Sequence, residues 1–166
     1  MSGLTIRGAE ERDVPLLLSL IRELAEYERL AGEVVATEED LSRSLFGERP
    51  AAEVLVATLD GLPVGFALFF HNFSTFLGRR GLYLEDLYVR PAARGRGVGR
   101  ALLVRLAAIA VERGCGRLEW AVLDWNDPAI GFYRRLGASP MSDWTVFRLA
   151  GPALAALAGG RGPDPG

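Results

Sequence analysis

The chain has 166 residues, with one cysteine, one histidine and a formal net charge of −2 at pH 7. That length suits a single domain with a sizeable core, and the small net charge favours neither nucleic acid nor an anionic membrane as a partner. One cysteine excludes an internal disulfide, and together with one histidine it cannot build a usual structural zinc site. The start also lacks the long apolar region of a signal peptide. We therefore expect a cytoplasmic protein with no metal, no nucleic-acid partner and no membrane association.

The first part of the chain predicts helices and a β-hairpin. An apolar stripe at helical spacing follows Asp13, which suits an N-cap, and Thr37-Glu-Glu-Asp40 resembles a capping box. Asp60-Gly61 is a strong signal for a two-residue hairpin turn. The expected elements are a strand over 4–7, a helix from 13, a helix from 37 to about 46, and strands over 53–59 and 63–70.

The remaining elements alternate between strands and helices. The expected set is a strand over 82–89, a helix from about 98, a strand over 117–123, a short helix from 128 and a strand over 144–149. This order predicts an α/β fold with a mixed central β-sheet flanked by helices. We expect one domain over residues 1–150 and a short Ala/Gly/Pro-rich tail over 151–166, of which residues 159–166 form a mobile terminus.

The segment from Arg94 to Arg100 is a glycine-rich turn that opens an apolar helix. Glycines allow positive φ and close approach of a ligand, and the free N–H groups of the first helical turn favour an anion. Arginines at 94, 96 and 100 add positive charge, so a phosphate or pyrophosphate is the expected ligand. A phosphate-binding P-loop is excluded because the chain has no lysine, and the dinucleotide spacing G-x-G-x-x-G is not met. A glycine-rich turn without a ligand is the alternative.

The spacing that does fit is R-x-x-G-x-G, formed by Arg94, Gly97 and Gly99. A second motif, W-N-x-P followed by F-Y-x-x-x-G-A, runs from Trp125 to Ala138. Together these motifs resemble the GNAT superfamily of N-acetyltransferases, and the match is closest to the diamine (spermidine/spermine) and thialysine acetyltransferase branch. The resemblance covers about residues 4–149 and implies the GNAT fold.

The resemblance implies acetyl-CoA as co-substrate. The backbone of residues 87–89 would bind the pantetheine arm, the N–H groups of residues 95–100 would hold the pyrophosphate, and Asn126 would lie beside the cofactor. The cofactor-binding residues expected in this way are Leu87, Tyr88, Val89, Arg94, Gly95, Arg96, Gly97, Val98, Gly99, Arg100, Asn126, Pro128, Ala129 and Leu136.

Two residues are expected to carry the chemistry. A protonated primary amine must lose a proton before it attacks a thioester, and the leaving thiolate benefits from an acid. By resemblance, Glu85 draws off the amine's proton and Tyr133 is the acid. Asp86 is adjacent to Glu85 on a strand, which predicts opposite faces of the sheet, and it is assigned a structural role. The alternatives are a salt bridge or edge strand for the two carboxylates and a core aromatic for Tyr133.

The expected amine pocket is acidic. Residues matching the family's polyamine site are Tyr27, Glu28, Glu85, Glu119, Trp120 and Ala121. If the resemblance is set aside, Tyr27 and Glu28 fit a solvent-exposed helix end equally well. The chain differs from the polyamine enzymes at two positions. It has Ser74 and Phe76 where those enzymes carry an acidic residue and a tryptophan.

These observations predict an N-acetyltransferase that transfers acetyl from acetyl-CoA to a small cationic amine, such as a diamine, polyamine or thialysine-like compound. Transfer would occur by direct attack in a ternary complex. The alternatives are a protein or peptide N-acetyltransferase and a non-catalytic acyl-CoA-binding regulator. Family members resembling the chain form dimers, so a homodimer is expected.

Overall fold

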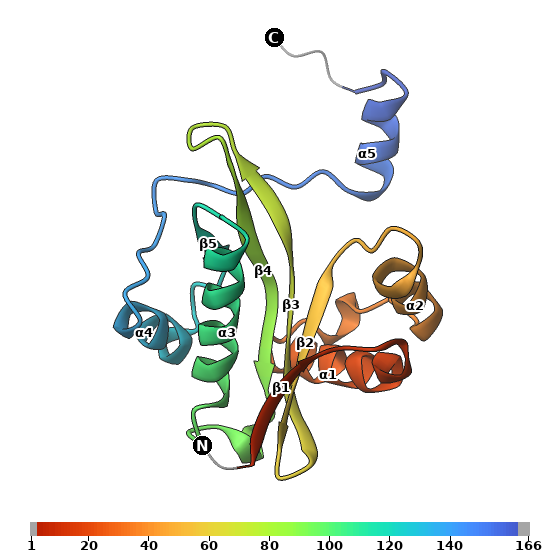
Figure 1. Cartoon of the computed structure of the whole chain (residues 1–166). Helices are drawn as coiled ribbons and strands as arrows, with labels where there is room; N and C mark the ends of the chain where they lie inside the picture. Colours follow the sequence, from red (N-terminus) through yellow and green to blue (C-terminus); the bar gives the residue numbers. More distant parts are fainter. Residues whose placement is uncertain (1–2, 163–166) are drawn as a thin grey trace. The chain divides into compact units, whose positions relative to one another are not determined.

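The computed structural model describes residues 3–162 of the chain, which form two compact units (Figure 1). The first unit ends at Leu123 and the second begins at Asp124. The first unit contains the whole β-sheet, and the second contains two helices. The last four residues of the predicted mobile terminus lie outside the described residues.

The sheet has five strands in the order β1-β2-β3-β4-β5. The first four strands pair antiparallel with their neighbours, and β5 pairs parallel with β4, so the sheet is mixed as predicted. The predicted strand over 117–123 is shorter than expected. The strands are β1 (Leu4–Gly8), β2 (Glu53–Leu59), β3 (Leu62–Ser74), β4 (Arg79–Val89) and β5 (Leu118–Trp120).

Helices cover both faces of this sheet, with α3 on one face and α1 and α2 on the other (Figure 1). Leucines of α1 and α2 pack with Val54, Val56, Phe66 and Tyr88 of the sheet in one buried cluster. Because alternate residues of a strand face opposite sides, one sheet can carry a core on each face. The helices of this unit are α1 (Val14–Tyr27), α2 (Glu38–Phe46) and α3 (Val98–Glu112), with single 3-10 turns at 11–13, 31–33 and 91–93.

Local sequence signals place several of these boundaries correctly. Thr37 caps α2 through a capping box with Asp40, as predicted. The turn at Asp60-Gly61 has φ of 52° and 81°, the left-handed pair that a two-residue hairpin needs. Asp13 precedes α1 but makes no side-chain cap bond to it, because its carboxylate accepts instead from Arg7 at 2.7 and 2.8 Å.

The second unit consists of α4 (Asp127–Arg135), α5 (Gly151–Ala158) and connecting segments. The predicted strand over 144–149 is wrong, because these residues form no helix or strand. Within residues 124–162 there is no other strand with which they could pair, and an extended segment without a partner is not a strand. Residues 151–158 of the predicted tail form α5. Over the described part of the chain, no helix combines the length and apolar character needed to cross a membrane.

Candidate active site

The segment of residues 94–100, here called the glycine loop, has the backbone expected of an anion site. Gly95 and Gly97 have φ of 76° and 80°, which L side chains rarely adopt. Gly97 is the N-cap of α3 and offers no side chain to the first-turn N–H groups. A Cβ at Gly95 would meet nothing within 4 Å, so open space faces this backbone. The loop therefore combines unused donors, a positive helix end and room for a ligand.

The strand that leads into the glycine loop has a partly unpaired edge. β3 pairs with β4 as far as Val89, but β5 pairs with it only over Leu82–Leu84. Within the described residues, β4 from Glu85 to Val89 therefore has a strand neighbour on one side only. An extended ligand can bind such an edge as an added strand, as predicted for the backbone of residues 87–89. The side chain of Tyr88 belongs to the buried core, so only its backbone is available there.

A β-bulge lies at Glu85. Leu84 pairs with Phe69 and Asp86 pairs with Leu68, so β4 has one residue more than β3 at this point. A bulge interrupts the alternation of side chains and commonly re-aims a residue near a functional site. The simple alternation that predicts opposite faces for Glu85 and Asp86 therefore does not apply here. The sequence of β4 alone could not show this, because a bulge exists only relative to the partner strand.

Three carboxylates, Glu28, Glu85 and Asp86, lie close enough to repel one another and are called the acidic cluster. Burial raises the pKa of Asp86 to about 6, and the charges of Glu85 and Glu28 add to the rise. Burial and the charge of Glu85 also raise the pKa of Glu28, which directly follows α1. A bound cation would relieve this repulsion, so the cluster suits an ammonium group. Sequence reasoning gave Asp86 only a structural role and missed its place in the cluster.

The other predicted amine-site residues have more mixed surroundings. Trp120 pairs with Leu84, immediately before the bulge, and exposed Ala121 follows it. Burial is the main cause of the raised pKa of Tyr83, and the charges of Glu85 and Glu119 add to the rise. However, the Glu119 carboxylate lies 3.0 Å from the Nε of Arg117, which offsets its charge. The structure thus brings these residues to the same stretch of β4, with Glu119 already paired.

Tyr27 is the last residue of α1 and lies under the guanidinium of Arg94, whose central carbon is 4.8 Å from the ring centroid. The Arg94 Nε donates to the carbonyl oxygen of Val89 at 2.9 Å. The predicted amine-site residue and the predicted cofactor-site residue are therefore in direct contact.

Ser74 and Phe76, the positions where the chain departs from the polyamine enzymes, lie at the hairpin end of β3 and β4. Ser74 is buried, and its hydroxyl accepts from the N–H of Leu77 at 3.2 Å. It pairs with Arg79, six residues before Glu85, and at ~3.3 Å per residue this places it about 20 Å from Glu85 along the strand. Within one chain, Ser74 and Phe76 therefore do not line a pocket with Glu85.

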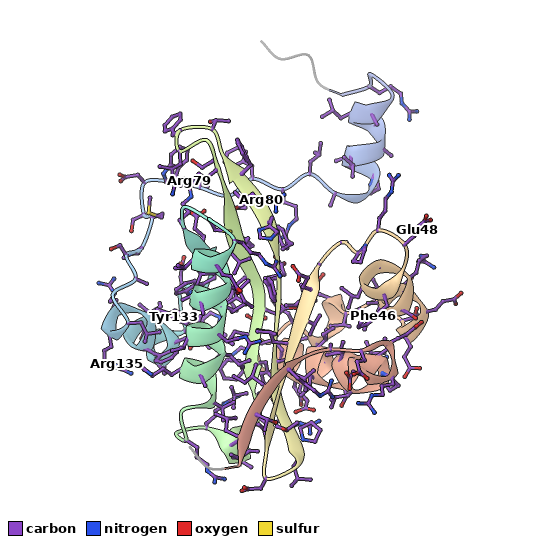
Figure 2. All side chains as sticks on the ribbon, viewed as in Figure 1. Phe46, Glu48, Arg79, Arg80, Tyr133 and Arg135 are labelled. Atoms are coloured by element: carbon purple, nitrogen blue, oxygen red, sulfur yellow. The ribbon has the colours of Figure 1, made fainter. Side chains whose placement is uncertain are left out.

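Tyr133 lies on α4 in the second unit (Figure 2). Its ring is tilted against Phe132, with centroids 5.6 Å apart. It is half-buried, and Gly137 follows the helix with φ of 93°. The catalytic role of Tyr133 remains a prediction.

The other predicted cofactor residues of the second unit lie at the two ends of the same helix. Asn126 is buried and caps α4, with its side-chain oxygen accepting from the Ala129 N–H at 3.4 Å. Pro128 lies in the first turn, and Leu136 follows the helix. Capping explains why Asn126 is buried, so its position beside a cofactor also remains a prediction. In the described residues, no group of three or more His, Cys, Asp or Glu could hold a metal ion.

Comparison with known proteins identifies the family. Residues 18–138 match the Acetyltransferase (GNAT) family. The chain is 42% identical to a thialysine N-epsilon-acetyltransferase of Bos taurus, over 96% of the chain and 99% of that protein. It is 35% identical to an L-ornithine N5-acetyltransferase of Arabidopsis thaliana, over 92% and 86% of the two chains. An integron cassette protein from the mobile metagenome of V. cholerae has a similar structure, with a TM-score of 0.80, 30% identity and coverage of 95% and 99%.

The chain therefore belongs to the GNAT acetyltransferase family and is an N-acetyltransferase. This family uses acetyl-CoA. The glycine loop fits the cofactor's phosphates, since Gly95 and Gly97 are left-handed, open space faces Gly95, and arginines 94, 96 and 100 are all exposed. The unpaired edge of β4 fits an extended pantetheine arm.

Proposed function

We propose that the protein transfers acetyl from acetyl-CoA to a primary amine of a small cationic substrate, by direct attack in a ternary complex. The observation that carries this proposal is the acidic cluster at the unpaired edge of β4, on the strand that leads into the glycine loop. One strand thus connects a site suited to a cation with a site suited to a phosphate. Relatives named for thialysine and ornithine, both cationic amino acids, support the same substrate class.

The acidic cluster supplies the proton chemistry. A primary amine has a pKa of ~10 and is mostly protonated near neutral pH, so it must lose a proton before it attacks. Glu85 is exposed at the bulge and accepts this proton directly or through water. Asp86, whose pKa is about 6, shares the negative charge of the cluster and makes the region more attractive to a cation. Acetyl-CoA supplies a reactive thioester when bound.

Tyr133 is proposed as the acid that donates its hydroxyl proton to the departing sulfur. The W-N-x-P and F-Y-x-x-x-G-A pattern around it and the family membership support this role. Asn126, Pro128, Ala129 and Leu136 are proposed to line the cofactor from the same helix. Holding both substrates in line would supply much of the rate without a covalent intermediate.

The favoured amine is short and carries one further charge. Glu28 lies beside Glu85 and would bind that second charge. Glu119 is paired with Arg117, so it does not extend the acidic surface as a long polyamine would need. A diamine or a thialysine-like amino acid therefore fits better than spermine.

We also propose a cytoplasmic homodimer. The single cysteine fits a reducing compartment. Large apolar side chains are exposed at two places, the β3–β4 hairpin and the segment over 144–149; Phe76 is 99% exposed and Phe147 is 91% exposed. Exposed aromatic residues of this kind are typical of an association surface, and a second copy of the chain is the proposed partner.

An acetyl-CoA turnover assay against a panel of amines tests the function. The panel contains a monoamine, 1,4-diaminobutane, ornithine, thialysine, spermidine, spermine and a lysine-containing peptide. We expect the highest kcat/KM for thialysine, ornithine or the diamine. A tenfold preference for spermine, or activity on the peptide with none on any small amine, would contradict the substrate assignment. Acetyl-CoA binding without turnover on any member would instead indicate a non-catalytic regulator.

A further inference from the structure

Arg94 contacts two aromatic rings in addition to the glycine loop it belongs to. Its guanidinium carbon lies 4.8 Å from the ring centroid of Tyr27 and 5.7 Å from that of Tyr88. Its Nε donates to the Val89 carbonyl oxygen at 2.9 Å. A planar guanidinium stacks on aromatic faces in a way that a lysine ammonium does not. Arg94 thus connects the end of α1, the end of β4 and the start of the glycine loop.

The two rings differ in how far they are exposed. Tyr88 is 6% exposed, belongs to the buried core and donates its hydroxyl to Glu23 of α1. Tyr27 is 39% exposed and ends its helix. Arg94 therefore contacts both a buried ring and a more exposed ring. Tyr27 is followed directly by Glu28 of the acidic cluster, so Arg94 contacts the residue next to that cluster.

We propose that Arg94 is a positioning residue that couples the cofactor site to the amine site by holding Tyr27, and with it Glu28, in place when the glycine loop is occupied. This inference rests on the proposed function. The Nε of Arg94 is engaged by Val89, and the two terminal nitrogens carry four further N–H donors that suit a phosphate. An anion bound to those nitrogens fixes the guanidinium plane, and a fixed plane fixes the ring stacked on it.

The coupling has a direct thermodynamic consequence. A side chain already ordered by the first ligand costs the second ligand less to order, so the two ligands bind with positive cooperativity. CoA should therefore tighten amine binding, and the amine should tighten CoA binding by the same factor. One exposed cation–π contact contributes about 0.5–1 kcal/mol, which corresponds to a coupling of roughly twofold to fivefold.

Arg96 provides a matched control. It is an exposed arginine on the same loop, two residues away, and no ring contact involves it among the described residues. Both Arg94→Leu and Arg96→Leu remove one positive charge from the cofactor site, so both should weaken CoA binding. Only Arg94→Leu removes the contact with Tyr27. Arg94→Lys keeps the charge and loses the planar stack, and it should behave like Arg94→Leu in the coupling.

The experiment is calorimetric titration of thialysine into the protein, without CoA and with CoA at a concentration that saturates each variant. In the wild type and in Arg96→Leu, CoA should lower the thialysine Kd roughly twofold to fivefold. In Arg94→Leu and Arg94→Lys the ratio should fall to about one. A wild-type ratio of one, or an unchanged ratio in Arg94→Leu, would overturn the coupling.

Steady-state kinetics separates this inference from the proposed function. Arg94→Leu could raise the KM for acetyl-CoA while its KM for the amine stays equal to that of the wild type. In that case Arg94 is only a phosphate ligand, so the coupling is wrong but the proposed function stands. If the wild type acetylates no amine of the panel and binds none, the proposed function fails and the coupling fails with it.

Discussion

The glycine loop and the acidic cluster lie at the same end of β4 and use opposite physical means. In the proposed cofactor site, the glycine loop, backbone groups would bind the ligand, and glycine is needed because Gly95 and Gly97 take positive φ. In the proposed amine site, the acidic cluster, side chains would bind the ligand, and their raised pKa values come first from burial and then from mutual repulsion. The first site depends on residues that are adjacent in sequence. The second depends on Glu28 and Glu85, which are far apart in the chain and meet only in the fold.

Gly97→Glu should have the largest effect, because it breaks the glycine loop and leaves the acidic cluster untouched. A side chain at φ of 80° is strained, and a carboxylate there repels the phosphates. We expect acetyl-CoA affinity to fall ~10³-fold or more, a loss of about 4 kcal/mol, measured by calorimetry. Circular dichroism should show a folded protein, and unchanged affinity in that folded variant would refute the loop assignment.

Tyr133→Phe tests a group outside both regions. It keeps the ring that packs against Phe132 and removes only the hydroxyl. If this hydroxyl protonates the leaving sulfur, kcat should fall ~10²-fold with a smaller change in acetyl-CoA affinity. Phe132→Leu is a control for packing on the same helix. Near-normal turnover in Tyr133→Phe would make Tyr133 a packing residue.

Glu85→Gln removes one charge from the acidic cluster and preserves shape. Turnover should fall roughly tenfold or more near neutral pH, and most at low pH, where the amine is most protonated. Raising the pH should recover part of the loss, because a larger share of the amine is then already deprotonated when it binds. A pH–rate profile measures this, and a loss that is uniform across pH would show that Glu85 does not accept the proton.

Asp86→Asn should have the smallest effect, and it tests the cost of the buried charge in the acidic cluster. Asp86 has a folded pKa of about 6, above its ordinary value of 3.8. The folded state therefore holds its proton more tightly than the unfolded state, so this group's contribution to stability falls as pH rises from about 4 to 6. Removing the charge should raise Tm by a few degrees at pH 7 relative to the wild type, with little difference at pH 4.

Thermal melts of Asp86→Asn and wild type across pH 4–8 measure the difference. Carboxylates with lowered pKa, such as Glu23 beside Arg90 and Glu53 beside Arg113, act in the opposite direction but are present in both proteins and cancel. If the two proteins differ equally at pH 4 and pH 7, the pKa of the Asp86 carboxyl is not raised in the folded state.

The same contrast explains how much the sequence alone could predict. The capping box at Thr37, the turn at Asp60-Gly61 and the left-handed Gly97 are local, and each was predicted correctly. The bulge at Glu85 depends on its pairing with β3, and the raised pKa of Asp86 depends mainly on burial in the fold, with smaller effects of Glu85 and Glu28. Neither can be obtained from residues that are close in sequence. The strand wrongly predicted over 144–149 fails for the same reason, because strand formation requires a partner edge.

The central claim is that the glycine loop and the acidic cluster hold their two substrates at the same time. Initial velocities measured while acetyl-CoA and thialysine are both varied test it directly. Direct attack in a ternary complex predicts double-reciprocal lines that intersect, and N-acetylthialysine should appear only when both substrates are present. Parallel lines, together with release of CoA in the absence of any amine, would show an acetylated enzyme intermediate and would contradict the account.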